Sequence, residues 1–203
     1  MRICQHVNPK QLHFERFRGE LPPIDGRPIE IEIGCADAQF LFERAIVDPD
    51  RLYVGLEIRE DLVDWVNRRA RERSAPVHAV FCQAQLHMAQ IFPPGGVDRV
   101  FVNFPDPWFK KKHQDRRMVD EVLADQIAVV ARSGAEVFVQ TDVWDIAIGA
   151  MATFDGDRLD RFENRCGEWT FWKQPNPYGV RSWREQNAEE TGLPIWRIQY
   201  HRR

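Results

Sequence analysis

Short apolar runs alternate with longer amphipathic segments along most of this chain, and this alternation constrains the fold more than any other feature. The apolar runs have the length of strands, whereas the segments between them carry apolar residues at helical spacing. The expected strands are 29–33, 52–56, 77–81, 97–104, 135–141 and 195–200, and the expected helices are 38–47, 60–73, 118–131 and 143–151. Strands separated by helices pair in parallel. The pattern therefore predicts an α/β fold with a largely parallel sheet and helices on both faces.

The chain length favours one domain with a short lead-in. A chain of 203 residues can bury a sizeable core, and this one shows neither an internal repeat nor a low-complexity linker. Pro22, Pro23 and Gly26 interrupt its first part, so residues 1–27 are expected to form an arm. Residues 28–203 are then expected to form a single Rossmann-like domain.

The composition limits the classes of function that fit. Hydrophobic residues make up 43% and charged residues 29% of the chain, and the net charge of −3 disfavours a nonspecific nucleic-acid coat protein. The four cysteines form no C-x-x-C pair, which disfavours a zinc site or a disulfide framework. No apolar run reaches the length of a membrane span, and no secretory apolar region follows the first residue. We expect a cytoplasmic protein without a metal or a membrane anchor.

The ends of the first two expected strands suit a nucleotide. Gly34 opens the turn after the first strand, where a Rossmann-like fold passes close to its cofactor. Glu57 ends the second strand, at about the 20-residue spacing at which a carboxylate binds ribose hydroxyls. Glu32 lies inside the first strand, where a buried acid needs a partner such as the cationic amino end of a ligand. The alternatives are an ordinary turn at Gly34 and solvated acids at the other two positions.

These residues alone leave NAD and S-adenosylmethionine open as cofactors. Ala36 and Ala38 stand where a dinucleotide-binding turn would carry further glycines. A pyrophosphate needs close approach of the backbone, whereas S-adenosylmethionine has no phosphate. The two alanines therefore favour S-adenosylmethionine.

One segment joins a conformationally restricted acid to a dense basic run. Asp106 lies between Pro105 and Pro107 at the end of the fourth expected strand, beside Trp108. Open α/β sheets bind ligands at the carboxyl ends of their strands, so Asp106 is expected in the ligand site. The cations that follow suit a polyanion, and they are Lys110, Lys111, Lys112, Arg116 and Arg117. This combination indicates chemistry on a nucleic acid, although a turn acid followed by a solvated basic surface is the alternative.

The same residues carry a resemblance to a known family. FPDPWFKKKHQDRR, residues 104–117, resembles the signature of the bacterial tRNA (guanine-N7-)-methyltransferases. EIGCADAQFL resembles the cofactor turn of that family, VGLEI its second-strand acid, and VQTDVWDIA its fifth-strand segment. HVNP and GVRSWREQNAEETGLPIWRIQY resemble its lead-in and its C-terminal block. The resemblance implies a Rossmann-like class I methyltransferase with a mostly parallel seven-stranded sheet and an antiparallel late strand.

The resemblance also implies roles for individual residues. Asp106 would be the active-site acid. The S-adenosylmethionine pocket would be lined by Glu32, Gly34, Glu57, Gln83 and Asp106. The guanine would be bound by Lys110, Asp142, Ser182 and Glu185, and tRNA phosphates by Lys111, Lys112, Arg116 and Arg117. Three departures from the family pattern are the two alanines of the turn, Gln83 in place of an acid, and Asp115 within the basic run.

The leading hypothesis is methyl transfer from S-adenosylmethionine to N7 of a guanine in the variable loop of tRNA. One alternative is a noncatalytic RNA-binding protein on the same fold, and another is a methyltransferase for a different base or a small molecule. An NAD-linked oxidoreductase is disfavoured by the glycine-poor turn. Both a monomer and a homodimer fit the sequence.

Overall fold

The described part of this protein is built on one seven-stranded sheet, and a computed structural model describes residues 17, 20–107 and 118–203. The strands are β1 (Ile29–Ile33), β2 (Leu52–Glu57), β3 (Val77–Phe81), β4 (Val97–Asn103), β5 (Ala131–Thr141), β6 (Phe162–Asn164) and β7 (Trp196–Arg202). The helices are α1 (Gln39–Val47), α2 (Glu60–Glu72), α3 (Ala84–Ile91), α4 (Glu121–Val130), α5 (Trp144–Phe154) and α6 (Trp183–Glu190). Most of the expected N-terminal arm, residues 1–16 and 18–19, lies outside this description.

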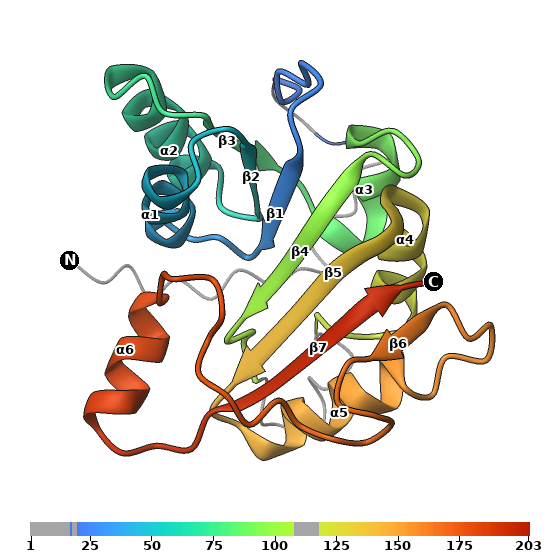
Figure 1. The fold of residues 1–203 in the computed structure, drawn as a ribbon. Coiled ribbons are helices and arrows are strands. Elements are labelled where there is room, and N and C mark those ends of the chain that lie inside the picture. Colours follow the sequence, from blue (N-terminus) through green and yellow to red (C-terminus); the bar gives the residue numbers. More distant parts are fainter. Residues whose placement is uncertain (1–16, 18–19, 108–117) are drawn as a thin grey trace.

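The sheet has the strand order β3-β2-β1-β4-β5-β7-β6 (Figure 1). Strands β1 to β5 pair in parallel, and β7 runs antiparallel to both β5 and β6. The predicted fold class, including the antiparallel late strand, is confirmed. The strand order reverses between β1 and β4, and in such sheets ligands bind in the crevice outside the carboxyl ends of the strands at that point.

Two hydrophobic cores lie on opposite faces of the sheet. One core joins the sheet to α3, α4 and α5, with Met88, Leu123 and Phe154 among its buried members. The other joins it to α1 and α2, with Leu41 and Val66 at its centre. Figure 1 shows α1 and α2 on one side of the sheet and α3 and α4 on the other. Within the ranges described, none of the helices is long and apolar enough to cross a membrane.

The two cores explain the unusual composition of β1. Both of its glutamates are buried, because a sheet covered on both faces leaves no solvent side for an alternating strand. Glu30 is fully buried and forms ion pairs with Arg44 at 3.0 Å, with Arg51 at 3.4 Å and with Arg99. The alternation therefore predicted a strand correctly, but the acidic positions of that strand are internal.

Several element boundaries differ from the sequence pattern. A helix was expected over 118–131 and a strand over 135–141, but α4 ends at Val130 and β5 begins at Ala131, so Gly134 lies within β5 with a φ of +77°. A register shift between β4 and β5 accompanies this early start of β5. The pattern did not predict α3, β6 or α6, which are short elements of eight, three and eight residues.

Candidate active site

The predicted cofactor residues lie at the carboxyl ends of adjacent strands. Glu32 is the penultimate residue of β1 and Glu57 the last residue of β2. Gln83 follows β3, and Asp106 follows β4. Parallel pairing brings these ends to one edge of the sheet, so the structure gathers residues that are distant in sequence.

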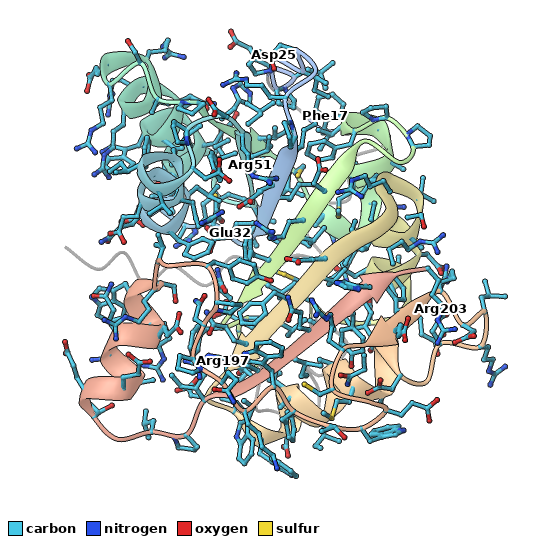
Figure 2. All side chains as sticks on the ribbon, in the orientation of Figure 1. Phe17, Asp25, Glu32, Arg51, Arg197 and Arg203 are labelled. Atoms are coloured by element: carbon cyan, nitrogen blue, oxygen red, sulfur yellow. The ribbon has the colours of Figure 1, made fainter. Side chains whose placement is uncertain are left out.

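Glu32, labelled on β1 in Figure 2, has one buried carboxylate oxygen without a partner among the described residues. Its Oε1 accepts a hydrogen bond from Nδ2 of Asn103 at 2.8 Å, whereas the buried Oε2 is the atom left unpaired there. Burial raises the pKa of Glu32 to about 8, and the Asn103 bond opposes that shift. A cationic group that reached Oε2 would satisfy this atom and favour the ionised carboxylate.

Glu57 organises the turn that follows β1. Its Oε2 accepts from the backbone N–H of Ala36 at 2.9 Å, and its Oε1 accepts from the backbone N–H of Ile58 at 2.9 Å. The side chain of Arg59 also donates to both carboxylate oxygens at 3.0 Å. Since a carboxylate has about four acceptor positions, binding of ribose hydroxyls requires the guanidinium of Arg59 to move.

Gln83 supplies a second unpaired acceptor. Within the described part of the chain, its buried Oε1 has no hydrogen-bond partner, while its Nε2 donates weakly to Gln85 at 3.4 Å. Its backbone N–H donates to Nδ1 of His87 at 3.1 Å, which fixes the residue at the start of α3. A buried acceptor of this kind fits a ligand amino group.

The turn after β1 is closely packed and strained. Gly34 has a φ of +74°, and an added Cβ there would lie 3.4 Å from Cε of Met118. Ala36 and Ala38 both have a φ of 51°, a left-handed conformation that costs an alanine roughly 1–2 kcal/mol. The turn is thus formed in the glycine-like conformation although alanines occupy it.

Asp106 is exposed beside this turn. It lines a small cleft with Pro105, Met118 and Asp145, and Met118 also contacts the Gly34 turn. The pKa of Arg59 is raised mainly by its bond to Glu57, and Asp106 contributes to the same rise. Asp106 is therefore close enough to Arg59, beside the predicted ribose site, to interact with its charge.

Backbone strain lies two residues before Asp106. Phe104 has a φ of 49° although it is not glycine and precedes a proline, a position that disfavours helical conformations. Its N–H donates to the backbone oxygen of Gln140 at 2.7 Å, so pairing with β5 continues up to the bend. Strain of this kind concentrates at functional sites.

The three predicted guanine contacts that the structure describes lie around α6. Asp142 follows β5 and forms an ion pair with Arg184. Ser182 caps α6, since its Oγ accepts from the N–H of Glu185 at 3.2 Å. Glu185 is 0% exposed, and its carboxylate accepts from Arg197 at 2.8 Å, from Asn176 at 2.9 Å and from Gln140 at 3.0 Å. The carboxylate of Glu185 is thus enclosed by protein donors.

Part of the predicted site falls outside the described residues. It comprises Trp108, Lys110, Lys111, Lys112, Arg116 and Arg117. The structure adds Arg59, Asn103 and Gln140, which the sequence reasoning did not single out. The signal for the latter two was a polar residue directly after a short apolar run, in VFVN and VFVQT.

The fold resembles that of Rossmann-like methyltransferases of known structure. The geranyl diphosphate C-methyltransferase from Streptomyces coelicolor A3(2) matches with a TM-score of 0.57 at 13% identity, covering 88% of this chain and 76% of that one. The 16S rRNA methyltransferase KamB also matches at 0.57 and 13%, covering 87% and 88%. At these identities the likeness concerns the fold.

Sequence relatives define the family within that class. A family model described as "Putative methyltransferase" matches residues 26–198. The tRNA (guanine-N(7)-)-methyltransferase of Synechococcus elongatus is 36% identical over 100% of this chain and 97% of its own length. The enzyme of the same name from Synechococcus sp. strain JA-3-3Ab is 34% identical over 100% and 86%. The chain belongs to the tRNA (guanine-N(7)-)-methyltransferase family.

Proposed function

We propose that this protein transfers a methyl group from S-adenosylmethionine to N7 of a guanine in the variable loop of tRNA. The family assignment supports the reaction, and one structural observation supports the cofactor. Two buried acceptors, Oε2 of Glu32 and Oε1 of Gln83, have no partner among the described residues and flank the Glu57 carboxylate. They fit a ligand that has an amino group at each end and a ribose between them.

Each cofactor residue would recognise one part of S-adenosylmethionine. Glu32 would hold the ammonium group, Glu57 the ribose hydroxyls and Gln83 the adenine amino group. When bound, S-adenosylmethionine supplies a methyl group on a sulfonium, which a nitrogen lone pair can accept. The alternative of a noncatalytic protein is weakened because the turn keeps its conformation, with the N–H of Ala36 bonded to Glu57.

Asp106 would stabilise the developing charge on the guanine. N7 has a free lone pair, so no proton has to leave before attack and no strong general base is required. Positive charge that forms on the ring makes its N1–H and N2–H groups stronger donors, and an acid that accepts from them lowers the barrier. Asp106 is exposed, and Pro105 and Pro107 restrict the backbone on both sides of it.

The remaining predicted residues would position the tRNA. Lys110, Asp142 and Ser182 would contact the target guanine or its neighbourhood. Glu185 would act indirectly by anchoring α6 to the sheet, because its carboxylate is enclosed by protein donors. Phosphates would be bound by Lys111, Lys112, Arg116 and Arg117, which gives position rather than sequence choice.

The Asp106→Asn variant tests this assignment. We expect it to bind S-adenosylhomocysteine, measured by calorimetry, within about twofold of the wild type, since the acid serves the guanine more than the cofactor. Turnover on tRNA should fall by about 100-fold or more, the effect of removing one electrostatic contact to a transition state. Asp145→Asn, which alters another acid of the same cleft, is the matched control. Near-normal turnover of Asp106→Asn would remove Asp106 from the mechanism.

A further inference from the structure

A line of four polar side chains, three of them buried and Asn103 partly buried, crosses the sheet from the proposed cofactor site to α6. It consists of Glu32 on β1, Asn103 on β4, Gln140 on β5 and Glu185 on α6. Strands β1, β4 and β5 are adjacent in the sheet, and Asn103 is the direct register partner of Gln140. Figure 2 labels Glu32, at one end of this line, and Arg197, which donates to Gln140 and Glu185 near the other end.

Every link in the line is a direct hydrogen bond. Asn103 donates to Glu32 at 2.8 Å and accepts from Nε2 of Gln140 at 2.9 Å. The same Nε2 donates to Glu185 at 3.0 Å, and Oε1 of Gln140 accepts from Nε of Arg197 at 3.3 Å. Gln140 is 0% exposed, so its amide is satisfied by these neighbours rather than by solvent.

The line has a fixed direction. An amide donates only through its nitrogen and accepts only through its oxygen, so neither Asn103 nor Gln140 can turn without breaking bonds on both sides. The carboxylate of Glu32 requires a donor at one end, and the guanidinium of Arg197 requires an acceptor at the other. In a buried setting such bonds strengthen one another, which makes the orientation of each group depend on the next.

The end at Glu32 has one buried acceptor that a ligand could satisfy. Its Oε2 lacks a partner in the described part of the protein, and its Oε1 depends on the donor that Asn103 presents. A bound ammonium group would hold Glu32 in its ionised form and would thereby strengthen the bond from Asn103.

The other end of the line, at α6, lies among the residues proposed to contact the guanine. Glu185 anchors α6 to the sheet, Ser182 caps the same helix, and Arg184 on its first turn holds Asp142. A change in the hydrogen bond between Gln140 and Glu185 would therefore change how firmly Ser182, Arg184 and Asp142 are held in position.

We propose that Gln140 is a positioning residue that couples the cofactor pocket to α6. Cofactor binding at Glu32 would then reduce the mobility of α6, the segment that receives the guanine. The coupling acts through the line Glu32–Asn103–Gln140–Glu185, and Gln140 itself touches neither ligand. Both sides rest on the proposed function, which places the guanine near α6 and the ammonium group of the cofactor at Glu32. By thermodynamic reciprocity, a less mobile α6 also strengthens cofactor binding.

The test uses Gln140→Leu with Gln199→Leu as its matched control. Gln199 lies one strand away on β7, is 3% exposed and donates to Tyr178 at 3.1 Å, outside the line. Calorimetry should show S-adenosylhomocysteine binding weakened about fivefold or more in Gln140→Leu. In Gln199→Leu the affinity should stay within about twofold of the wild type.

Hydrogen exchange gives a second readout that does not depend on catalysis. S-adenosylhomocysteine should slow amide exchange in α6 of the wild type and of Gln199→Leu, and should leave it unchanged in Gln140→Leu. Equal slowing in all three proteins would overturn the coupling. Equal loss of affinity in both variants would also overturn it, because that result indicates a general packing role.

A charge-swapped variant covers the case in which Gln140→Leu does not fold. In the double variant Gln140→Glu with Glu185→Gln, the introduced carboxylate accepts from Arg197 and from the introduced amide, whereas Asn176 loses its bond to residue 185 and keeps its bond to the backbone oxygen of Val180 at 3.0 Å. Asn103 must then donate either to that new carboxylate or to Glu32, and the other acid must take up a proton. Because the new carboxylate competes with Glu32 for this donor, the proposal predicts a folded protein in which S-adenosylhomocysteine affinity levels off at a higher pH than in the wild type. An unchanged pH profile would refute it.

These outcomes are separate from the fate of the proposed reaction. A wild-type protein that binds S-adenosylhomocysteine but does not methylate tRNA would contradict the proposed function and leave the Gln140 comparison intact. Conversely, an active enzyme whose Gln140 variants match the Gln199 control would contradict only the coupling.

Discussion

At the scale of single residues, the buried carboxylate of Glu32 makes cofactor affinity depend on pH. Its pKa is raised to about 8 by burial, so in the free protein it is largely protonated at neutral pH. An ammonium ligand favours the ionised form, and binding therefore releases a proton. We expect the affinity for S-adenosylhomocysteine to rise by up to about tenfold per pH unit below this pKa and to level off above it.

Calorimetry over a range of pH measures this dependence. Glu32→Gln keeps the shape of the side chain but has no proton to release, so it should bind more weakly and with a flatter pH profile. Titration in buffers of different ionisation enthalpy should show proton release in the wild type alone. The same slope in both proteins would mean that another group is responsible.

Ala36 is a second residue whose conformation has a measurable cost. Its φ of 51° is one that glycine adopts freely and alanine does not. We expect Ala36→Gly to raise the free energy of unfolding by about 1 kcal/mol, the strain relieved less the greater freedom of glycine in the unfolded chain. Urea denaturation measures the change. Ala152→Gly, at an exposed position in α5, should instead lower stability by about 1 kcal/mol.

The sequence predicted some site residues and not others for a physical reason. Glu32 and Glu57 could be placed because strand ends follow from local apolar patterns. Asn103, Gln140 and Arg197 could not, because their bonds depend on which strands pair and in which register. Burial of Glu185 was unpredictable in the same way, since its three donors come from separate parts of the chain.

At the scale of secondary-structure elements, α6 depends on its cap and on Glu185. It has eight residues, only two of which are buried, so packing contributes little to its stability. We expect Ser182→Ala to cost about 1 kcal/mol of local stability and to speed amide exchange in α6. Ser133→Ala, at an exposed position in β5, is the control. Unchanged exchange in Ser182→Ala would show that the cap does not limit the opening of α6.

Long parallel strands and amphipathic helices were predictable from the sequence, and short elements were not. The strands β1 to β4 match their apolar runs to within one residue, because each is buried on both faces. In contrast, β6 has three residues and α6 has few apolar ones, so neither produces a periodic pattern. Their positions are set by the antiparallel pairing of β6 with β7 and by the bonds of Glu185.

At the scale of the whole molecule, a net charge of −3 means that tRNA affinity must come from a local cluster of cations. We expect tRNA binding to fall by about tenfold or more between roughly 50 and 200 mM salt. Lys111→Ala should weaken binding and lower the salt slope by about one unit. Arg132→Ala removes an exposed cation at the amino end of β5 and should change neither quantity. Filter binding at several salt concentrations measures both quantities. A flat response of the wild type would contradict tRNA binding by a local cluster of cations.

The most direct measurement is the identity of the methylated nucleoside. Purified protein would be incubated with unmodified tRNA and labelled S-adenosylmethionine, and the digested product analysed by chromatography. The account predicts 7-methylguanosine as the one labelled nucleoside, formed at a single site in the variable loop. Label in a different nucleoside, or none with a protein that binds both ligands, would contradict it.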